Sequence, residues 1–257
     1  MKNIVLIGSG NLATQLSLSL LYNGYNIIQV WSQQIKNANK LAEKLHCNAT
    51  DSLKNLAKAD LYIIAVKDDK IESIVKTITV DNIIHTSGGS DIDIFDNRFN
   101  NFGVFYPLQT FNKEINIDFE NIPICIEANN KEFGLKLNNL AKSLSKSITF
   151  LNSKQRKKLH VAAVFACNFS NHMYTNAYNL LKEDNLDFKL LIPLINQTIL
   201  KLNDNKPGDV QTGPAKRKDV KLIKHQLEMI SNKKTKDLYQ FITNSIIELN
   251  ELNELNE

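Results

Sequence analysis

The stretch Val5-Leu6-Ile7-Gly8-Ser9-Gly10-Asn11-Leu12-Ala13 decides the fold of the N-terminal half of this chain. It matches the pattern G-x-G-x-x-[GA] between an apolar run and a helix-like segment, which is the context in which this pattern binds a dinucleotide. Gly8 would allow the tight turn, Gly10 would let the backbone approach a pyrophosphate, and Ala13 would let the helix pack closely on the strand. The phosphates would face the free N–H groups at the positive end of the helix. We therefore predict a dinucleotide site that includes Gly8, Ser9, Gly10, Asn11 and Leu12.

The residues after this stretch alternate short apolar runs with helical patterns up to about residue 152. Continuous apolar strands joined by helical crossovers are typical of a parallel sheet that is covered on both faces. This pattern predicts an α/β Rossmann domain with a mostly parallel, doubly wound sheet. The expected strands are residues 4–7, 27–31, 61–66, 83–85, 102–105, 122–126 and 148–151.

After residue 152 only helical periodicity remains, in four stretches between residues 155 and 249. We therefore predict a Rossmann domain over residues 1–152, an all-α C-terminal domain over residues 153–250 and a low-complexity tail over residues 251–257. Ser153 is the expected cap of the first long helix, and Asp219 is the expected cap of a later one. The run Gln155-Arg156-Lys157-Lys158 is expected to be a solvated face.

Composition and charge argue against several classes of protein. The chain has 257 residues with 31 basic against 27 acidic residues, and this balanced charge does not indicate nucleic acid. No apolar run approaches the roughly 20 residues of a membrane span, and no group of His, Cys and Asp has the spacing of a metal site. Cys47, Cys125 and Cys167 lie far apart, so we expect buried thiols in a reducing compartment and a cytoplasmic protein.

The end of the second predicted strand indicates which dinucleotide is bound. Trp31 is followed by Ser32 and Gln33, with no carboxylate to accept hydrogen bonds from a ribose 2′-hydroxyl. Ser32 and Gln33 can donate hydrogen bonds to a 2′-phosphate, and Lys36 is close enough in sequence to reach it. These residues favour NADP over NAD.

Two later loops come directly after predicted strands and should lie at the same edge of the sheet. The first adds Ala65, Val66 and Lys67 to the cofactor site. The second loop, which contains Thr86, Ser87 and Gly88, offers hydroxyl groups and flexible backbone to an anionic substrate or to the nicotinamide.

Two other segments could also contact the substrate. A loop near residue 109 offers an amide, and the turn near residue 213 offers backbone N–H groups and a guanidinium for a carboxylate. The predicted substrate contacts are Thr86, Ser87, Gly88, Gln109, Gly213 and Arg217.

A polar stripe on the first long helix is the best candidate for proton transfer. At about 100° per residue, His160, Asn168 and Asn171 lie within roughly 80° of one another, in an apolar segment where unsatisfied polar groups are costly. Because a histidine titrates near neutral pH, His160 is the expected general acid. Asn168 and Asn171 would orient the substrate or tie the helix to its neighbours. The structural alternative is a core histidine bonded to a carbonyl group.

Five motifs together resemble one family: Gly8-Ser9-Gly10, Val66-Lys67-Asp68-Asp69, His85-Thr86-Ser87-Gly88, Tyr106-Pro107-Leu108-Gln109-Thr110-Phe111 and Thr212-Gly213-Pro214-Ala215. It is the group of bacterial Rossmann-like NADP oxidoreductases with a helical C-terminal domain of unknown function, similar to ketopantoate reductase, pyrroline-5-carboxylate reductase and 6-phosphogluconate-dehydrogenase-like enzymes. The resemblance implies a homodimer through the helical domain and an active site between domains. Ketopantoate reductases carry a catalytic Lys and an Asn on a similar helix, where this chain has His160 and Val164.

These observations predict an NADPH-dependent oxidoreductase that transfers hydride to a small carboxylate-bearing carbonyl compound, such as a ketopantoate-type 2-keto acid. Two alternatives stay open. One is an imine reductase of the pyrroline-5-carboxylate reductase type, and the other is a non-enzymatic NADP-binding regulatory module. The expected partners are the small-molecule substrate and a second copy of the chain, without nucleic acid and without a membrane.

Overall fold

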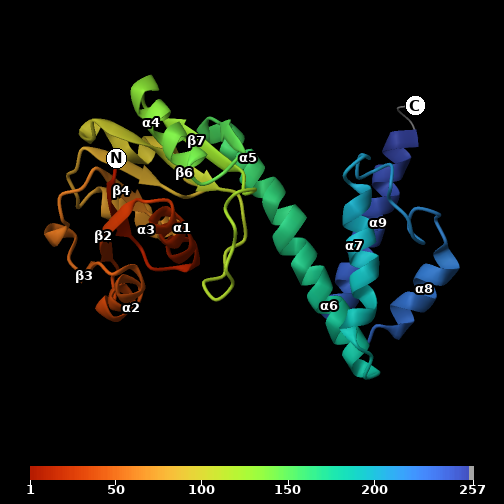
Figure 1. Cartoon of the computed structure of the whole chain (residues 1–257). Helices are drawn as coiled ribbons and strands as arrows, with labels where there is room; N and C mark the ends of the chain where they lie inside the picture. Colours follow the sequence, from red (N-terminus) through yellow and green to blue (C-terminus); the bar gives the residue numbers. More distant parts are fainter. Residues whose placement is uncertain (255–257) are drawn as a thin grey trace. The chain divides into compact units, whose positions relative to one another are not determined.

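The computed structural model describes residues 1–254, apart from the side chains of Asn97, Asn253 and Glu254 (Figure 1). The chain divides into two compact units, Met1–Cys167 and Asn168–Glu257, and each is described by itself. Within the described residues, the first unit contains an eight-stranded sheet with the order β3-β2-β1-β4-β5-β6-β7-β8. Neighbouring strands are parallel except for the antiparallel pair β6 and β7. The predicted mostly parallel, doubly wound sheet followed by helices is therefore confirmed.

The elements of the first unit agree closely with the predicted alternation. Its strand β3 was not predicted, because its three residues give no apolar run. The strands are β1 (Asn3–Ile7), β2 (Asn26–Trp31), β3 (Asn48–Thr50), β4 (Leu61–Ile64), β5 (Asn82–His85), β6 (Asn101–Pro107), β7 (Ile124–Ala128) and β8 (Ile148–Phe150). The helices are α1 (Asn11–Tyr22), α2 (Ile35–Leu45), α3 (Asp68–Val75), α4 (Lys131–Lys142) and α5 (Ser153–Ala163), with short 3-10 helices η1 (Leu53–Asn55) and η2 (Ile92–Arg98).

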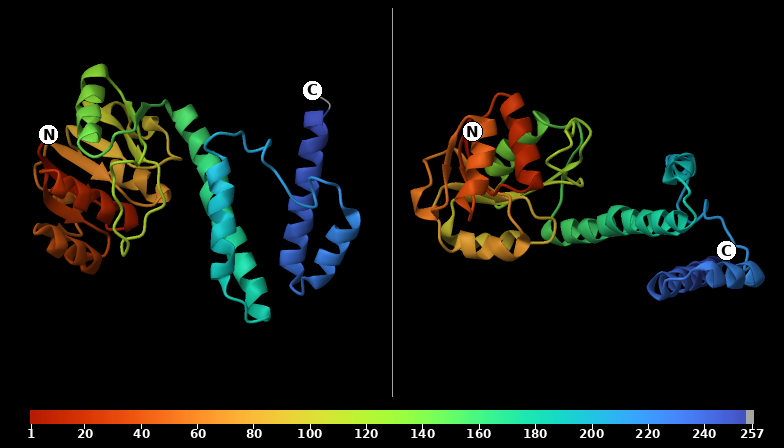
Figure 2. Two further views of the ribbon diagram at one scale, coloured as in Figure 1. Left: turned by 45° about the vertical axis from the view of Figure 1, so that its right-hand side comes forward. Right: turned by 90° about the horizontal axis from the view of Figure 1, so that it is seen from below.

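Two hydrophobic layers enclose the sheet, with helices on both of its faces (Figure 2). On one face, α1, α2 and α4 contribute side chains that include Leu16, Leu41 and Phe133. On the other face, α3 and η2 contribute side chains that include Ile71 and Phe95. Because both faces are covered, β4 is buried at every position, which explains why its sequence is apolar throughout.

The second unit is helical over its described residues. It contains α6 (Ser170–Glu183), α7 (Ile192–Lys201), α8 (Val220–Met229) and α9 (Lys233–Glu254), with the 3-10 helix η4 (Phe188–Leu191) before α7. A π-helical segment, η3 (Val164–Phe169), joins α5 to α6, and the two units divide inside this segment. Of the predicted tail, residues 251–254 form the end of α9, and residues 255–257 lie outside the described part of the chain.

The helix caps show how closely the local sequence determines the residue at which a helix begins. Asn152 caps α5 in a capping box, in which its side chain accepts a hydrogen bond from the Gln155 N–H and its own N–H donates to Gln155 Oε1. The prediction that Ser153 caps this helix was wrong by one residue. Asp219 caps α8 as predicted, by accepting a hydrogen bond of 3.1 Å from the Leu222 N–H.

Two further sequence expectations concern the burial of the cysteines and the presence of membrane-spanning helices. Cys125 is buried, but the expectation of a buried thiol is wrong for Cys167, which is exposed on η3. Among residues 1–254, no helix combines the length and the apolar content that crossing a bilayer requires.

We expect Gly103→Ala to lower the free energy of unfolding by about 1–3 kcal/mol, the usual cost of overpacking. Gly103 lies in β6, and a Cβ there would stand 2.4 Å from the Glu127 carbonyl oxygen of β7. The matched control is Gly134→Ala in α4, where a Cβ would meet its nearest neighbours at 3.6 Å and 3.7 Å. That control should be neutral or stabilising, since alanine favours a helix. Urea denaturation compares the two, and a Gly103→Ala protein as stable as the wild type would contradict the overpacking at β6.

Candidate active site

A cavity of about 820 Å³ lies where β1, β2 and β4 end. The sheet order changes direction between β1 and β4, and open α/β sheets bind ligands at such a point. Every predicted cofactor residue except Lys36 lines this cavity. Sequence reasoning missed six further lining residues, of which four lie on α3 or just after it, one ends β2 and one lies in η1. The missed residues are Trp31, Leu53, Lys70, Ser73, Ile74 and Thr77.

Gly8 is the residue on which the shape of this cavity depends. Its φ of +134° is a conformation that residues with side chains rarely adopt. A Cβ on Gly8 would stand 2.1 Å from the Ala65 carbonyl oxygen, so no side chain fits between these two segments. The Gly8 N–H donates to the Trp31 carbonyl at 2.8 Å, and the Ala65 N–H donates to the Ile7 carbonyl at 2.8 Å. The three strand ends are thus tied together at one glycine.

The N-terminus of α1 fits a pyrophosphate. Gly10 is the N-cap residue, no side chain caps the helix there, and its first turn contains no acidic residue. A Cβ on Gly10 would meet nothing within 4 Å, so the backbone borders open space. The first N–H groups of a helix have no partners within the helix, and they carry its positive end. These features suit the binding of phosphate groups.

The charge of the cavity wall suits NADP. Among the described residues that line it, none is Asp or Glu, and two are the lysines Lys67 and Lys70. Ser9 Oγ and Ser32 Oγ are 3.0 Å apart at the end of β2. Trp31, which also lines the cavity, has a buried indole N–H for which the described residues provide no acceptor. At the end of β2 a 2′-phosphate would meet the hydroxyl groups of Ser9 and Ser32, whereas a carboxylate at this position would repel it.

A second cluster of polar residues brings together three segments that are distant in sequence. The Tyr106 hydroxyl at the end of β6 and His160 Nδ1 on α5 are 2.9 Å apart, and the two rings meet edge to face. The backbone of Gly88, in the loop after β5, packs against both rings. A Cβ on Gly88 would stand 2.7 Å from His160 Nδ1 and 2.8 Å from Tyr106 Cζ. Burial raises the pKa of Tyr106 to about 12, so its hydroxyl stays protonated at neutral pH.

His160 and Gly88 were candidates from the sequence, but the Tyr106 hydroxyl was not. The sequence singled out the loop that begins at Tyr106, and only the amide of Gln109 was assigned a role there. Gln109 is exposed, and its Oε1 accepts a hydrogen bond of 2.8 Å from the Thr110 N–H. It lines a separate hollow with Phe111 and Ile115. The structure therefore joins His160 to the start of this loop and not to Gln109.

The hydroxyl groups of the loop after β5 are engaged within the protein. Thr86 Oγ1 donates to the Ile64 carbonyl at 3.2 Å, and Ser87 Oγ accepts from the N–H groups of Gly89 and Ser90 at 3.0 Å and 2.9 Å. Both side chains are buried. What this loop presents to a ligand is therefore its backbone near Gly88.

The loop after β5 also approaches the start of α3, and α3 contributes residues to the wall of the cofactor cavity. A Cβ on Gly89 would stand 3.0 Å from Asp68 Oδ2. Asp68 is the first residue of α3 and directly follows Lys67, which lines the cavity. The Tyr106–His160 pair and the cofactor cavity therefore belong to the same edge of the sheet, with the loop after β5 between them.

The remaining predicted residues belong to the second unit. Asn168 and Asn171 are both exposed. The π-helical segment adds a residue to the turn, which rotates the later residues by about 100° relative to an unbroken α-helix. The spacing that placed these residues on one stripe with His160 does not hold across it. Gly213 has a φ of +104°, and the exposed Arg217 lies in the same turn-rich segment before α8.

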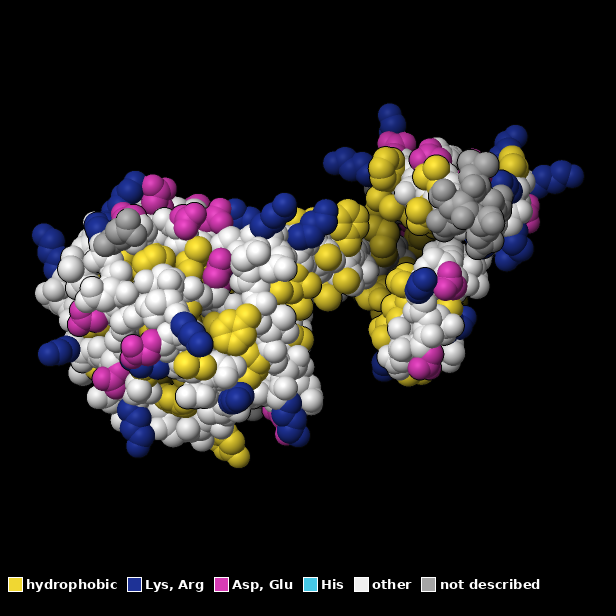
Figure 3. All heavy atoms as spheres, turned by 90° about the horizontal axis from the view of Figure 1, so that it is seen from above, with side chains coloured by type: hydrophobic (Ala, Val, Ile, Leu, Met, Phe, Trp, Pro, Cys, Tyr) yellow, Lys and Arg dark blue, Asp and Glu magenta, His cyan; other side chains and the backbone are white. Residues whose placement is uncertain are grey.

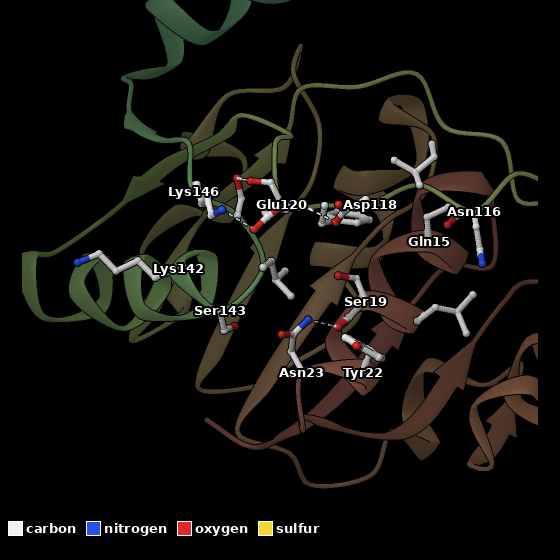
Figure 4. Close-up of a pocket in the computed structure, with 15 residues that line it drawn as sticks. Gln15, Ser19, Tyr22, Asn23, Asn116, Asp118, Glu120, Lys142, Ser143 and Lys146 are labelled. Atoms are coloured by element: carbon white, nitrogen blue, oxygen red, sulfur yellow. Dashed lines mark hydrogen bonds and ion pairs between the residues drawn. The ribbon is translucent and has the colours of Figure 1, made fainter.

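Another hollow, of about 840 Å³, lies beside α1 and the end of α4 (Figure 4). Several of its polar side chains bond to the protein itself. Gln15 Nε2 donates to the carbonyl oxygens of Asn112 and Ile115, each at 2.8 Å, and Lys146 pairs with Glu120 at 2.5 Å. It contains none of the predicted site residues. These contacts fix residues 112–120 against the domain and indicate a structural role.

Together, the cavity over the glycine turn and the polar pair beside it define a Rossmann-type NADP-dependent oxidoreductase. Residues 3–86 match the family described as NADP oxidoreductase, coenzyme F420-dependent, and residues 122–246 match a domain of unknown function, DUF2520. A Bacteroides fragilis protein described as a "putative NADP oxidoreductase" is 39% identical, with 96% of this chain and 98% of that chain covered and a TM-score of 0.90. The chain belongs to the same family as this Bacteroides fragilis NADP oxidoreductase, which confirms the predicted resemblance.

More distant structures share the fold. An imine reductase from Myxococcus stipitatus, solved with NADP+, is 12% identical over 97% of this chain and 93% of its own, with a TM-score of 0.65. A 1-pyrroline-5-carboxylate reductase from Streptococcus pyogenes is 14% identical over 96% of this chain and 98% of its own, with a TM-score of 0.64. No curated protein matches the chain.

We expect Gly10→Ala to weaken NADPH binding at least tenfold while leaving the fold intact, because the added methyl group enters the space for the pyrophosphate and meets no protein atom. Trp31 is the single tryptophan of the chain and lines the cavity, so its fluorescence should report binding. Urea denaturation provides the control for folding. An unchanged dissociation constant in a normally folded variant would contradict this placement of the phosphates.

Proposed function

We propose that this enzyme reduces a small carboxylate-bearing carbonyl compound with NADPH, and that His160 donates the proton. The observation that carries the proposal is the Tyr106–His160 pair beside the cofactor cavity. The expected substrate is a 2-keto acid of the ketopantoate type. A cyclic imine of the pyrroline-5-carboxylate type is the second candidate, favoured by the fold that the chain shares with reductases of imines over most of its length.

The chemistry needs a hydride at the substrate carbon and a proton at its oxygen or nitrogen. Bound NADPH supplies the hydride and is oxidised to NADP+. The protein supplies the proton and the position of the substrate. His160 Nδ1 lies at the Tyr106 hydroxyl, so the imidazolium would give its proton from Nε2. The Tyr106 oxygen would accept a hydrogen bond from His160 Nδ1–H before and after the proton transfer. This bond would fix the orientation of the imidazole ring.

Gly88 would complete this arrangement by packing where the two rings meet. Its backbone lies against both His160 and Tyr106, which prevents the imidazole from turning toward the loop. Such confinement matters because a general acid must be within hydrogen-bond reach of the atom that it protonates.

We expect His160→Asn to lower kcat by about 10²- to 10⁴-fold, the usual contribution of a general acid, with little change in NADPH affinity. Tyr106→Phe removes only the hydroxyl group and should cost less. The matched control is His46→Asn, at an exposed histidine that ends α2 with a φ of 52°, a conformation that asparagine tolerates. NADPH consumption is measured with ketopantoate, related 2-keto acids and pyrroline-5-carboxylate.

The screen separates the candidate functions. Activity with 2-keto acids that depends on His160 supports the carbonyl reductase, and activity with the imine alone selects the second candidate. Full activity of His160→Asn would exclude the histidine as the donor. Oxidation of NADPH by none of these compounds would overturn the proposed substrate class.

We propose further that the enzyme is a homodimer through its helical unit. Helices α6 and α7 contain no buried residue, although α7 and the segment before it carry Leu190, Ile192, Leu194, Ile199 and Leu200, all exposed. Hydrophobic side chains gather over the helices of this unit (Figure 3). Exposed apolar surface of this extent marks a binding face. A second copy carries the same face, and a two-fold interface pairs such a face with itself.

We expect light scattering after size-exclusion chromatography to give twice the chain mass of 29.2 kDa. Replacing Leu190 and Leu194, which are 67% and 64% exposed, by aspartate should shift the protein toward the monomer. Tyr22→Asp is the control, because Tyr22 is 92% exposed but lies in the first unit. A wild-type monomer, or a dimer that persists in the double variant, would refute this interface.

A further inference from the structure

Arg156 is the largest fully buried side chain of the described residues, with 1% of its surface exposed. It lies in the run that sequence analysis assigned to a solvated face, and that expectation was wrong for this residue. Burying a guanidinium is costly unless it is paired and hydrogen-bonded. The structure therefore has to compensate for this charge, and the partners of Arg156 show which segments the residue holds together.

The partners of Arg156 come from three separate segments. Nη1 pairs with Glu127 Oε2 on β7, and Nη2 donates to the Ser90 carbonyl at 2.5 Å and to Ser153 Oγ at 3.1 Å. Glu127 in turn accepts hydrogen bonds of 2.8 Å from the N–H and the hydroxyl of Ser153. One side chain thus joins α5, β7 and the loop after β5.

That loop is braced at both ends by His85. The His85 Nδ1 accepts from the Ser87 N–H at 3.2 Å, so its proton resides on Nε2, which lies 3.3 Å from the Asp91 carbonyl oxygen. Burial, together with the charge of Arg156, lowers the pKa of His85 to about 3, so the ring stays neutral in this tautomer. Lys157 pairs with the Asp91 carboxylate from outside. The loop is therefore fixed at its start, its middle and its end.

The spacing of Arg156 and His160 connects this network to the proton donor. Residues four apart lie on one face of a helix, one turn from each other. Arg156 reaches the loop at Ser90, and His160 packs on the same loop at Gly88. The bonds from Arg156 to Glu127 and to the Ser90 carbonyl, called the Arg156 anchor below, thus set the distance between α5 and the loop. The imidazole must fit between Gly88 and Tyr106 at this point.

We propose that Arg156 is a positioning residue, which holds the His160 ring against Gly88 and Tyr106 by binding Glu127 and the Ser90 carbonyl at once. Its importance for turnover rests on the proposed function, in which His160 donates the proton. Arg156 does not line the cofactor cavity, and its hydrogen bonds go to Glu127, Ser90 and Ser153. Its loss should therefore misplace the donor and leave cofactor binding unchanged.

The experiment compares Arg156→Lys with Glu127→Gln and with Arg98→Lys. Lysine keeps the charge but cannot reach both partners with one ammonium group. Glu127→Gln weakens the same anchor by changing its other partner, and it serves as the test if Arg156→Lys does not fold. Arg98 makes an exposed ion pair with Asp96 in the same unit and is the matched control. NMR of histidine-labelled protein follows the His160 ring, whose signals are assigned by their loss in His160→Asn. Steady-state kinetics with NADPH give kcat and KM.

Arg156→Lys should lower kcat by about 10- to 100-fold, the scale expected when a catalytic group is displaced by about an ångström, with the KM for NADPH changed less than about twofold. The His160 signals should shift in both anchor variants and stay unchanged in Arg98→Lys. His160 signals that stay unchanged in a folded anchor variant would overturn the proposal. If the wild-type enzyme reduces none of the substrates, the proposed function fails, and the NMR comparison still decides whether Arg156 positions His160.

Discussion

The close approach of Gly8 to the Ala65 carbonyl is the constraint on which the rest of the first unit depends. A Cβ in that place would stand 2.1 Å from the oxygen, so β1 and β4 can end side by side only around a glycine. Their ends then form the point where the strand order reverses. The cofactor cavity, the direction of α1 and the positions of the next loops all depend on that junction.

A glycine also permits close packing at the cluster of Tyr106 and His160. Gly88 allows backbone to lie against the rings of His160 and Tyr106, as Gly8 allows it to lie against Ala65. The difference is in how the contact is held. Strand hydrogen bonds secure Gly8, whereas the loop that carries Gly88 depends on polar side chains, with the buried pair of Arg156 and Glu127 at its centre. A buried ion pair contributes little net stability. Its role here is therefore to fix the position of the loop relative to α5 and β7.

Sequence reasoning succeeded where the information is local. The glycine turn and the apolar strands depend on residues a few positions apart, although the cap of α5 was predicted one residue late. Nearly all the predicted cofactor residues line the cavity. It failed where partners are remote. Arg156 resembled a solvated residue because Glu127 and Ser90 lie 29 and 66 positions away, and the Tyr106–His160 contact spans 54 positions. The π-helical segment was also invisible, since helical periodicity assumes one pitch throughout.

The position of the proposed proton donor separates the roles that we expect of the two units. Tyr106, Gly88, His160 and the Arg156 anchor all belong to the first unit, as does the whole cofactor cavity. Their geometry is set by one sheet and by the start of α5. Among the described side chains of the helical unit, three apolar ones are buried: Ala215, Ile223 and Ile230. We therefore expect its part to be assembly, so substitutions in the two units should affect separable properties: proton transfer in the first unit and oligomeric state in the second.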